Sequence, residues 1–242
     1  MRLQTSNFKL HTSVGEMFDR ISPTYDLLNH LLSFGRDCAW RRRVAGLLCD
    51  GKGLRVADLA TGTGDLMIAL LRHGPPIADA VGLDVSERML EVFGRKLCRS
   101  GLADRARLVQ ADASATPFPE GAFDAVTMGF GIRNTSDVGA TLREIHRILR
   151  PGGAALILEF SLPRNRVLRW CHLKYLRLGV PFIGGLISGD RQAYRYLNES
   201  IEAFYSAGDF LALMKESGFA EVSATPLTWG VASIYRGVKR PD

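Results

Sequence analysis

The chain has 242 residues, of which 46% are hydrophobic and 23% charged, a balance typical of a soluble globular protein with one core. A formal net charge of +6 permits attraction to nucleic acid, anionic lipid or an acidic substrate, and equally an unspecialised basic surface. The cysteines lie far apart without a C-x-x-C pair, which argues against a metal site and favours a reduced, cytoplasmic protein. We find neither a signal peptide nor an uncharged stretch of the roughly 20 residues that a membrane span needs.

The N-terminal region predicts a helical cap in front of the main fold. Apolar residues at helical spacing in 14–29 are interrupted at Ser22 and Pro23. A further helix is expected over 37–48, with Trp40 on its apolar face. The three arginines 41–43 beside that face are interpreted as a solvated surface.

The stretch from Leu54 to Asp65 predicts a nucleotide-binding turn. A short apolar strand leads into Gly62 and Gly64, which let the backbone turn sharply and expose its amides. Asp84 ends a second apolar run 20 residues after Gly64, the distance at which a carboxylate reaches ribose hydroxyls. Together these features favour a nucleoside cofactor over a plain structural turn.

The same turn argues against a dinucleotide. The pattern G-x-G-x-x-G would place a third glycine where this chain has Met67. Asp65 puts a carboxylate at the start of the next helix, where it would repel a diphosphate but suit a positively charged ligand. S-adenosylmethionine, which carries a sulfonium and an amino group, is such a ligand.

Strands and helices alternate along the centre of the chain, which predicts a doubly wound, mostly parallel α/β sheet. Strands are expected at 54–60, 79–84, 106–110, 123–129 and 153–160, and helices at 65–73, 86–98, 137–149, 194–204 and 209–217. A C-terminal antiparallel hairpin of strands 220–228 and 231–238 brings the sheet to seven strands. Ligands bind at the carboxyl ends of parallel strands, so the glycine turn, Asp84, Asp112 and the residues after Met128 should meet in one crevice.

Residues 162–190 interrupt this alternation with a basic amphipathic helix and an apolar loop. Five cations occur in this segment before any acidic residue: Arg164, Arg166, Arg169, Lys174 and Arg177. Trp170 and other apolar residues are interleaved with them. From the segment alone, contact with an anionic membrane surface and an ordinary lid helix both remain open.

Several motifs taken together resemble those of one family. They are Y-D-L-L-N (25–29), D-L-A-T-G-T-G-D (58–65), P-F-P-E-G-A-F-D (117–124), G-F-G-I-R-N (129–134), L-R-P-G-G (149–153), L-E-F-S (158–161) and Y-R-Y-L-N-E-S-I (194–201). Over nearly its whole length the chain resembles the menaquinone and ubiquinone biosynthesis C-methyltransferases. The resemblance implies a single domain with the class I methyltransferase (Rossmann-like) fold, divided into a cap (1–50), a cofactor-binding core (51–161), a helical lid (162–205) and a closing segment (206–242).

The resemblance also implies the reaction partners. S-adenosylmethionine is the expected cofactor, and a polyprenylated demethylquinol, demethylmenaquinol first, the expected acceptor. The alternatives are a ubiquinone-precursor benzoquinol, another phenol, or a non-catalytic cofactor-binding scaffold. A prenylated acceptor favours membrane contact by 162–190, so we expect a cytoplasmic enzyme at the inner face of the cell membrane. A homodimer stays open, and nucleic acid is not expected, since no N-P-P-Y-type motif is present.

Six cofactor-binding residues follow from matching motifs: Gly62, Thr63, Gly64, Asp84, Asp112 and Ala113. Asp84 would accept hydrogen bonds from both ribose hydroxyls, and Asp112 from the adenine amine. The amides of the glycine turn would hold the amino-acid portion.

Four residues are candidates for catalysis: Arg133, Asn134, Tyr25 and Asp65. Methylation of a ring carbon requires deprotonation of a neighbouring hydroxyl, so Arg133 would stabilise the phenolate while Asn134 fixes the ring. Tyr25 would close the site from the cap, and Asp65 would assist through water. A structural salt bridge is an equal alternative for Arg133, and simple packing is the favoured alternative for Tyr25.

Overall fold

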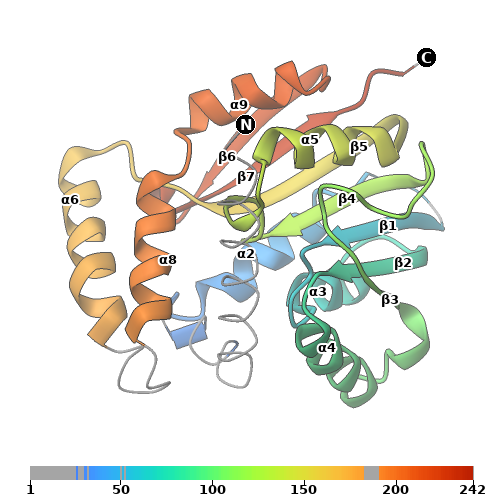
Figure 1. Ribbon diagram of the computed structural model, residues 1–242, viewed down its shortest axis with the longest axis horizontal. Coiled ribbons are helices and arrows are strands. Elements are labelled where there is room, and N and C mark those ends of the chain that lie inside the picture. The colour runs from blue at the N-terminus through green and yellow to red at the C-terminus, as the bar shows by residue number, and fades with distance from the viewer. Residues whose placement is uncertain are drawn as a thin grey trace, which may run out of the picture.

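The computed structural model describes residues 26, 30–31, 33–49, 51, 53–182 and 191–241, the first four residues of the last range by their backbone alone. Its strands are β1 (Leu54–Leu59), β2 (Ile77–Asp84), β3 (Arg107–Gln110), β4 (Phe123–Gly129), β5 (Leu149–Phe160), β6 (Glu221–Leu227) and β7 (Ala232–Val238). They form one seven-stranded sheet in the order β3-β2-β1-β4-β5-β7-β6 (Figure 1). Strands β1 to β5 are parallel, and β7 runs antiparallel to both of its neighbours. The expected sheet, including the terminal hairpin, is confirmed.

Helices cover both faces of the sheet and extend beyond one end of it. They are α2 (Arg36–Ala45), α3 (Asp65–His73), α4 (Glu87–Arg99), α5 (Val138–Ile148), α6 (Arg166–Lys174), α8 (Arg191–Ala203) and α9 (Ala207–Glu216). Buried side chains of α2, α3 and α4 share one core layer, whereas those of α5 and α9 share the layer on the opposite face. Figure 1 shows α6 and α8 side by side beyond the end of the sheet. No helix in the described ranges is long and apolar enough to span a bilayer.

The chain reverses its direction of winding between β1 and β4. From β1 it passes outward to β2 and β3, and then returns to β4 on the other side of β1. In open α/β sheets this reversal opens a crevice at the carboxyl ends of the two central strands. The functional site is therefore expected just beyond Leu59 and Gly129.

Several element boundaries differ from the sequence-based ones. The helix expected over 37–48 ends earlier, at Ala45, with Gly46 as its C-cap. The strand expected from 153 begins at Leu149, because Phe123 pairs with Leu149 while Ala125 pairs with Ala154. The intervening residues form an irregularity within one strand. The helix expected in 14–22 lies outside the described residues.

The interpretation of residues 41–43 as a solvated surface is wrong for Arg41. Arg42 and Arg43 are exposed, but Arg41 is only 7% exposed. It forms an ion pair with Asp37 in the same helix, and its Nη2 lies 3.5 Å from Oδ2 of Asp65 on α3. Arg41 thus joins the cap helix to the start of α3.

Gly64 is required for both its backbone conformation and its lack of a side chain. Its φ of +82° favours glycine, and an added Cβ would lie 1.9 Å from the buried ring of Phe93 on α4. We expect Gly64→Ala to lower the free energy of unfolding by about 3 kcal/mol, as backbone strain and overpacking combine. Gly62→Ala is the matched control, since φ is +56° there and no atom lies within 4 Å. Urea unfolding should show a loss of about 1 kcal/mol for the control; equal losses would contradict the steric argument.

Candidate functional site

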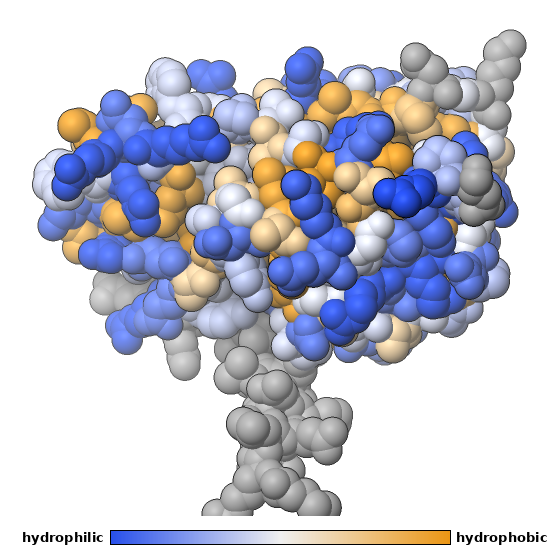
Figure 2. All heavy atoms as spheres, turned by 90° about the horizontal axis from the view of Figure 1, so that it is seen from above, coloured by the Kyte–Doolittle hydropathy of each residue, from blue (hydrophilic) through white to orange (hydrophobic). Residues whose placement is uncertain are grey.

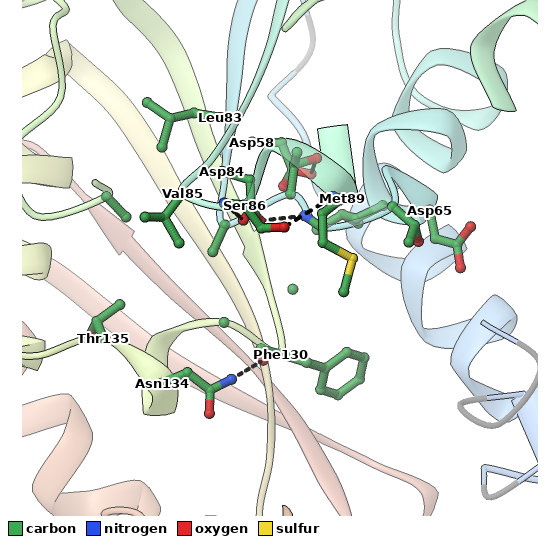
Figure 3. Close-up of a pocket in the computed structure, with 18 of the residues that line it drawn as sticks. Asp58, Asp65, Leu83, Asp84, Val85, Ser86, Met89, Phe130, Asn134 and Thr135 are labelled. Carbon is green, nitrogen blue, oxygen red and sulfur yellow. Dashed lines mark hydrogen bonds between the residues drawn. The ribbon is translucent and has the colours of Figure 1, made fainter. Parts of the chain in front are cut away.

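A cavity lies at the carboxyl ends of β1, β2 and β4 (Figure 3), with about 1080 Å³ of empty space that includes the open solvent at its mouth. Its wall is built from the glycine turn after β1, Asp84 at the end of β2, Asp112 and Ala113 after β3, and Gly129 at the end of β4. These segments are far apart in sequence and meet because parallel strands present their carboxyl ends at one edge. The predicted convergence of the glycine turn, Asp84, Asp112 and the residues after Met128 on one crevice is confirmed, although Gly64 itself is not among the lining residues. That these residues bind the cofactor stays a prediction.

Asp84 is held in place by the backbone of two turns. The carboxylate is buried, with Oδ2 accepting from the Gly62 amide at 2.8 Å and Oδ1 from the Ser86 amide at 2.9 Å. Ser86 is in turn the N-cap of α4 and accepts from the Met89 amide at 3.1 Å. A carboxylate can accept several hydrogen bonds at once, and this one lines the cavity with its position already fixed.

The expectation of bare amides at both glycines does not hold in this structure. The Gly62 amide donates to Asp84, and the Gly64 amide donates to the Thr61 carbonyl at 3.0 Å. The turn therefore closes on itself. A Cβ added to Gly62 would still meet no atom within 4 Å, so open space remains beside the turn for a ligand.

Thr63 belongs to a charged cluster that was not predicted from the sequence. Its hydroxyl donates to Oδ1 of Asp26 at 2.5 Å, and Lys96 Nζ lies 2.8 Å from Asp26 Oδ2. Lys96 also forms an ion pair with Asp65. Asp26 belongs to the Y-D-L-L-N motif and could have been considered for that reason, whereas no sequence pattern singles out Lys96 on α4. The Asp65 carboxylate is thus compensated by cations of the chain itself.

Asp58 lies at the end of β1 among the cavity-lining residues and is fully buried. Its carboxylate accepts from the hydroxyls of Thr61 and Thr127, each at 2.6 Å. Burial raises the pKa of Asp58 to about 6, against the lowering effect of these two hydrogen bonds.

This raised pKa predicts a pH-dependent contribution to stability. Because the folded state binds the Asp58 proton more tightly than the unfolded state does, protonation of Asp58 stabilises the fold. This contribution is fully present below pH 3.8, the ordinary pKa, and is lost as the pH rises through the folded-state pKa of about 6. Asp58→Asn removes the effect, so the stability of the variant relative to wild type should rise by about 2 kcal/mol between pH 4 and pH 7. Urea unfolding across this range measures it. Asp79→Asn, at an exposed ion pair with Arg107, is the control; the same pH profile in both variants would contradict the assignment.

Arg133 is not among the residues that line the cavity. Its side chain is 4% exposed, and Nη1 lies 2.6 Å from Oε1 of the fully buried Glu159 on β5. The same nitrogen donates to the Phe130 carbonyl at 2.7 Å. Burial raises the pKa of Glu159, while the guanidinium opposes that shift. The salt-bridge alternative is thus present in the structure, and a direct catalytic role for Arg133 stays a prediction.

Asn134 does line the cavity, on the wall across from Asp84 (Figure 3). Its side-chain oxygen accepts from the Tyr196 hydroxyl on α8 at 3.2 Å, and its amide group approaches the Phe130 carbonyl at 3.4 Å. Ser200 of α8 completes the group by accepting from Arg133 Nε at 3.4 Å. The G-F-G-I-R-N, L-E-F-S and Y-R-Y-L-N-E-S-I motifs therefore form one hydrogen-bonded network.

The remaining predicted residues are placed as follows. Asp112 is exposed at the cavity rim and accepts from the amide and hydroxyl of Ser114, both at 2.7 Å. Ala113 beside it is buried. Tyr25 lies outside the described residues, so its role stays a prediction.

One cluster of potential metal ligands lies in the described part of the cap. Ligand atoms of His30, Asp37 and Cys38 lie within 4.8 Å of one another. Asp37 is already bonded to Arg41 and accepts from the Ser33 hydroxyl at 2.8 Å. Because the guanidinium compensates this carboxylate, we assign no metal to the cluster.

Comparison with known proteins identifies the family. Residues 5–239 match the ubiE/COQ5 methyltransferase family. The chain belongs to this family. A demethylmenaquinone methyltransferase of Thermus thermophilus is 47% identical over 91% of this chain and 99% of its own length. A ubiquinone/menaquinone biosynthesis C-methyltransferase of Geobacter sulfurreducens is 43% identical over 93% of this chain and 88% of its own. Membership of the ubiE/COQ5 family confirms that the protein is a methyltransferase and that S-adenosylmethionine is its methyl donor.

Solved structures show the same fold at much lower identity. A methyltransferase from Thermotoga maritima, described as a possible histamine N-methyltransferase, superposes with a TM-score of 0.67 at 20% identity, covering 94% of this chain and 100% of its own. The [4+2]-cyclase SpnF superposes with a TM-score of 0.70 at 18% identity, covering 96% of this chain and 97% of its own. These likenesses confirm the class I methyltransferase fold of this ubiE/COQ5 family member and concern the fold alone.

Proposed function

We propose that this enzyme transfers a methyl group from S-adenosylmethionine to a ring carbon of demethylmenaquinol. The observation that carries the proposal is the hydrogen-bonded network of Arg133, Glu159, Asn134 and Tyr196. Of these residues Asn134 lines the cavity, on the wall across from Asp84. The network joins three of the sequence motifs that resemble those of this family, and it places one of its polar side chains at the cavity. The names of the relatives, which refer to demethylmenaquinone and to ubiquinone/menaquinone biosynthesis, support the same acceptor class.

The residues around the glycine turn fit the methyl donor. S-adenosylmethionine supplies an activated methyl group on a sulfonium. We assign its ribose hydroxyls to Asp84, its adenine to Asp112 and Ala113, and its amino-acid portion to the turn around Thr63. Open space beside Gly62 and the fixed carboxylate of Asp84 support this assignment.

The acceptor side is assigned to Asn134. Electron density at a quinol ring carbon rises when a neighbouring hydroxyl loses its proton, and a polar side chain at the wall can orient that hydroxyl. We propose that Arg133 acts as a positioning residue, since it is bound to Glu159 and to the Phe130 carbonyl next to Asn134. Alignment of the acceptor and exclusion of water then supply much of the rate, because the sulfonium is already a reactive donor.

A ubiquinone precursor is the second candidate acceptor, favoured by the relative that is named for both quinones. Both acceptors are reduced rings with a prenyl tail and would use the same wall. The scaffold alternative, binding without turnover, would leave the donor bound and every quinol unmethylated.

We further propose that the enzyme works in the cytoplasm at the inner face of the cell membrane. A prenylated acceptor is held in the bilayer, so the enzyme must reach it there. A homodimer remains a prediction, which sedimentation of the purified protein would test.

Complementation tests the proposed function. A bacterium deficient in quinone ring methylation would express this chain, and its quinones would be analysed by mass spectrometry. We expect the methylated quinone to return, whereas continued accumulation of the demethylated species would overturn the proposal. A strain that lacks methylation of both quinones decides between the two acceptors, by which product reappears.

A further inference from the structure

Helix α6, the π-helical turn Tyr175–Gly179 that continues it and the helical residues 180–182 carry an apolar stripe that the described residues leave exposed. Its members are Val167 (70% exposed), Trp170 (62%), Leu178 (65%) and Phe182 (65%), hereafter the outer stripe. Their spacing keeps them near one side of a helical segment. No residue of α6 is buried, which is unusual for a helix with this many apolar side chains.

The opposite side of the same segment is firmly packed. Leu176 and Val180 are 4% and 2% exposed and form a small core with Ile201 of α8. Phe34, in the turn just before α2, adds a further exposed ring, whose centroid lies 5.8 Å from that of Tyr175. The outer stripe is thus presented by an anchored element.

Exposed cations are interleaved in sequence with the outer stripe. Arg164, Arg166 and Arg169 are exposed and form no ion pair with a described residue, whereas Arg177 is bound to Glu202. Lys174 Nζ lies 5.8 Å from the centroid of the Trp170 ring. Figure 2 shows the result at the α6 end of the molecule, where hydrophobic side chains are interleaved with long hydrophilic ones. A second copy of this face would meet like charges, so the charge pattern favours an anionic occupant over a symmetric dimer.

We propose that the outer stripe and Arg164, Arg166 and Arg169 dock the enzyme on an anionic lipid bilayer. Apolar side chains would enter the boundary between headgroups and acyl chains, while the arginines contact the phosphates. Tyr196 of α8 joins this end of the molecule to Asn134 at the cavity wall. Helix α8 would therefore connect the docked segment to the acceptor side of the site. This inference rests on the proposed function for its purpose, since a prenylated acceptor resides in such a bilayer.

Vesicle flotation tests the docking surface. Wild-type protein should float with vesicles of phosphatidylcholine containing phosphatidylglycerol, and should do so weakly with phosphatidylcholine alone or at high salt. Arg166→Gln with Arg169→Gln should weaken partitioning about 25-fold, because each cation near an anionic surface contributes about a factor of five. Trp170→Ser should weaken partitioning onto the vesicles as well.

Two control variants remove the same kinds of side chain from elsewhere on the surface. Arg88→Gln with Arg99→Gln removes the same charge from exposed positions on α4, and Leu108→Ser removes an exposed apolar residue from β3. Both controls should float like wild type.

The outcomes separate docking from catalysis. Absence of flotation, or equal flotation of all variants, would overturn the docking surface. The proposal would also be overturned if the wild-type protein were a dimer that binds no vesicles and Trp170→Ser made it monomeric. The outer stripe would then be covered by a second copy of the chain. Methylation of a short-chain, water-soluble demethylquinol without vesicles reports on the proposed function alone. The docking variants should retain it, and its absence in wild type would count against the function without bearing on flotation.

Discussion

Arg133→Met should lower the free energy of unfolding by about 3–5 kcal/mol, because it leaves the buried Glu159 without its partner. Glu159 is fully buried, and besides Arg133 it accepts from the Phe160 amide at 2.8 Å. Burial already raises the pKa of Glu159, and loss of the guanidinium removes the effect that opposes this rise. Urea unfolding at neutral pH measures the change.

Two further variants show whether the loss comes from an orphaned charge. Arg133→Met combined with Glu159→Leu should recover most of the stability, since a buried ion pair is often replaceable by apolar residues of similar volume. Arg150→Met breaks a pair with Asp124 in which the arginine is 46% exposed, and should lose at most about 1 kcal/mol. A loss for Arg133→Met no larger than this control would contradict the importance of the buried pair.

Asp84→Asn should weaken S-adenosylmethionine binding by about 10²–10³-fold. The substitution removes the charge expected to accept from the ribose hydroxyls, and hydrogen bonds to a charged group contribute about 1.5–3 kcal/mol each. In the wild type the backbone amides of Gly62 and Ser86 both donate to this carboxylate. In the variant the side-chain NH2 group must face one of these two amides, so that two donors meet and one hydrogen bond is lost. Isothermal titration calorimetry measures the dissociation constant.

Asp112→Asn is the matched control, because an amide oxygen at the cavity rim can still accept from the adenine amine. Its affinity should stay within about threefold of wild type, since an equivalent acceptor is retained. Equal weakening in both variants would show that the two carboxylates are not distinguished as we propose.

The general plan of the site could be predicted from the sequence because it depends on topology. Alternating strands and helices predict a parallel sheet, and the carboxyl ends of such strands share one edge. Gly62, Asp84 and Asp112 lie at or just after the carboxyl ends of three different strands, so their convergence could be predicted without knowledge of side-chain packing. The position of Asn134 at the same crevice follows from β4 in the same way.

The pairings within the site could not be predicted, since they join positions with no common periodicity. Lys96 meets Asp26 and Asp65 from a different helix, and Glu159 meets Arg133 from the neighbouring strand. Arg41 shows the same limit, because a run of three arginines suggests a solvated surface whichever of them turns inward. In each case tertiary contacts decide the role of a charge that the local pattern leaves open.

The central claim is the transfer of a methyl group to a quinol ring carbon, and one measurement tests it directly. Purified protein would be incubated with S-adenosylmethionine carrying a trideuterated methyl group and with chemically reduced, short-chain demethylmenaquinone, followed by mass spectrometry of the quinone. We predict a single trideuteromethyl group on a ring carbon, with release of the ring proton and formation of S-adenosylhomocysteine. An unlabelled ring, or label found only on oxygen, would contradict the claim.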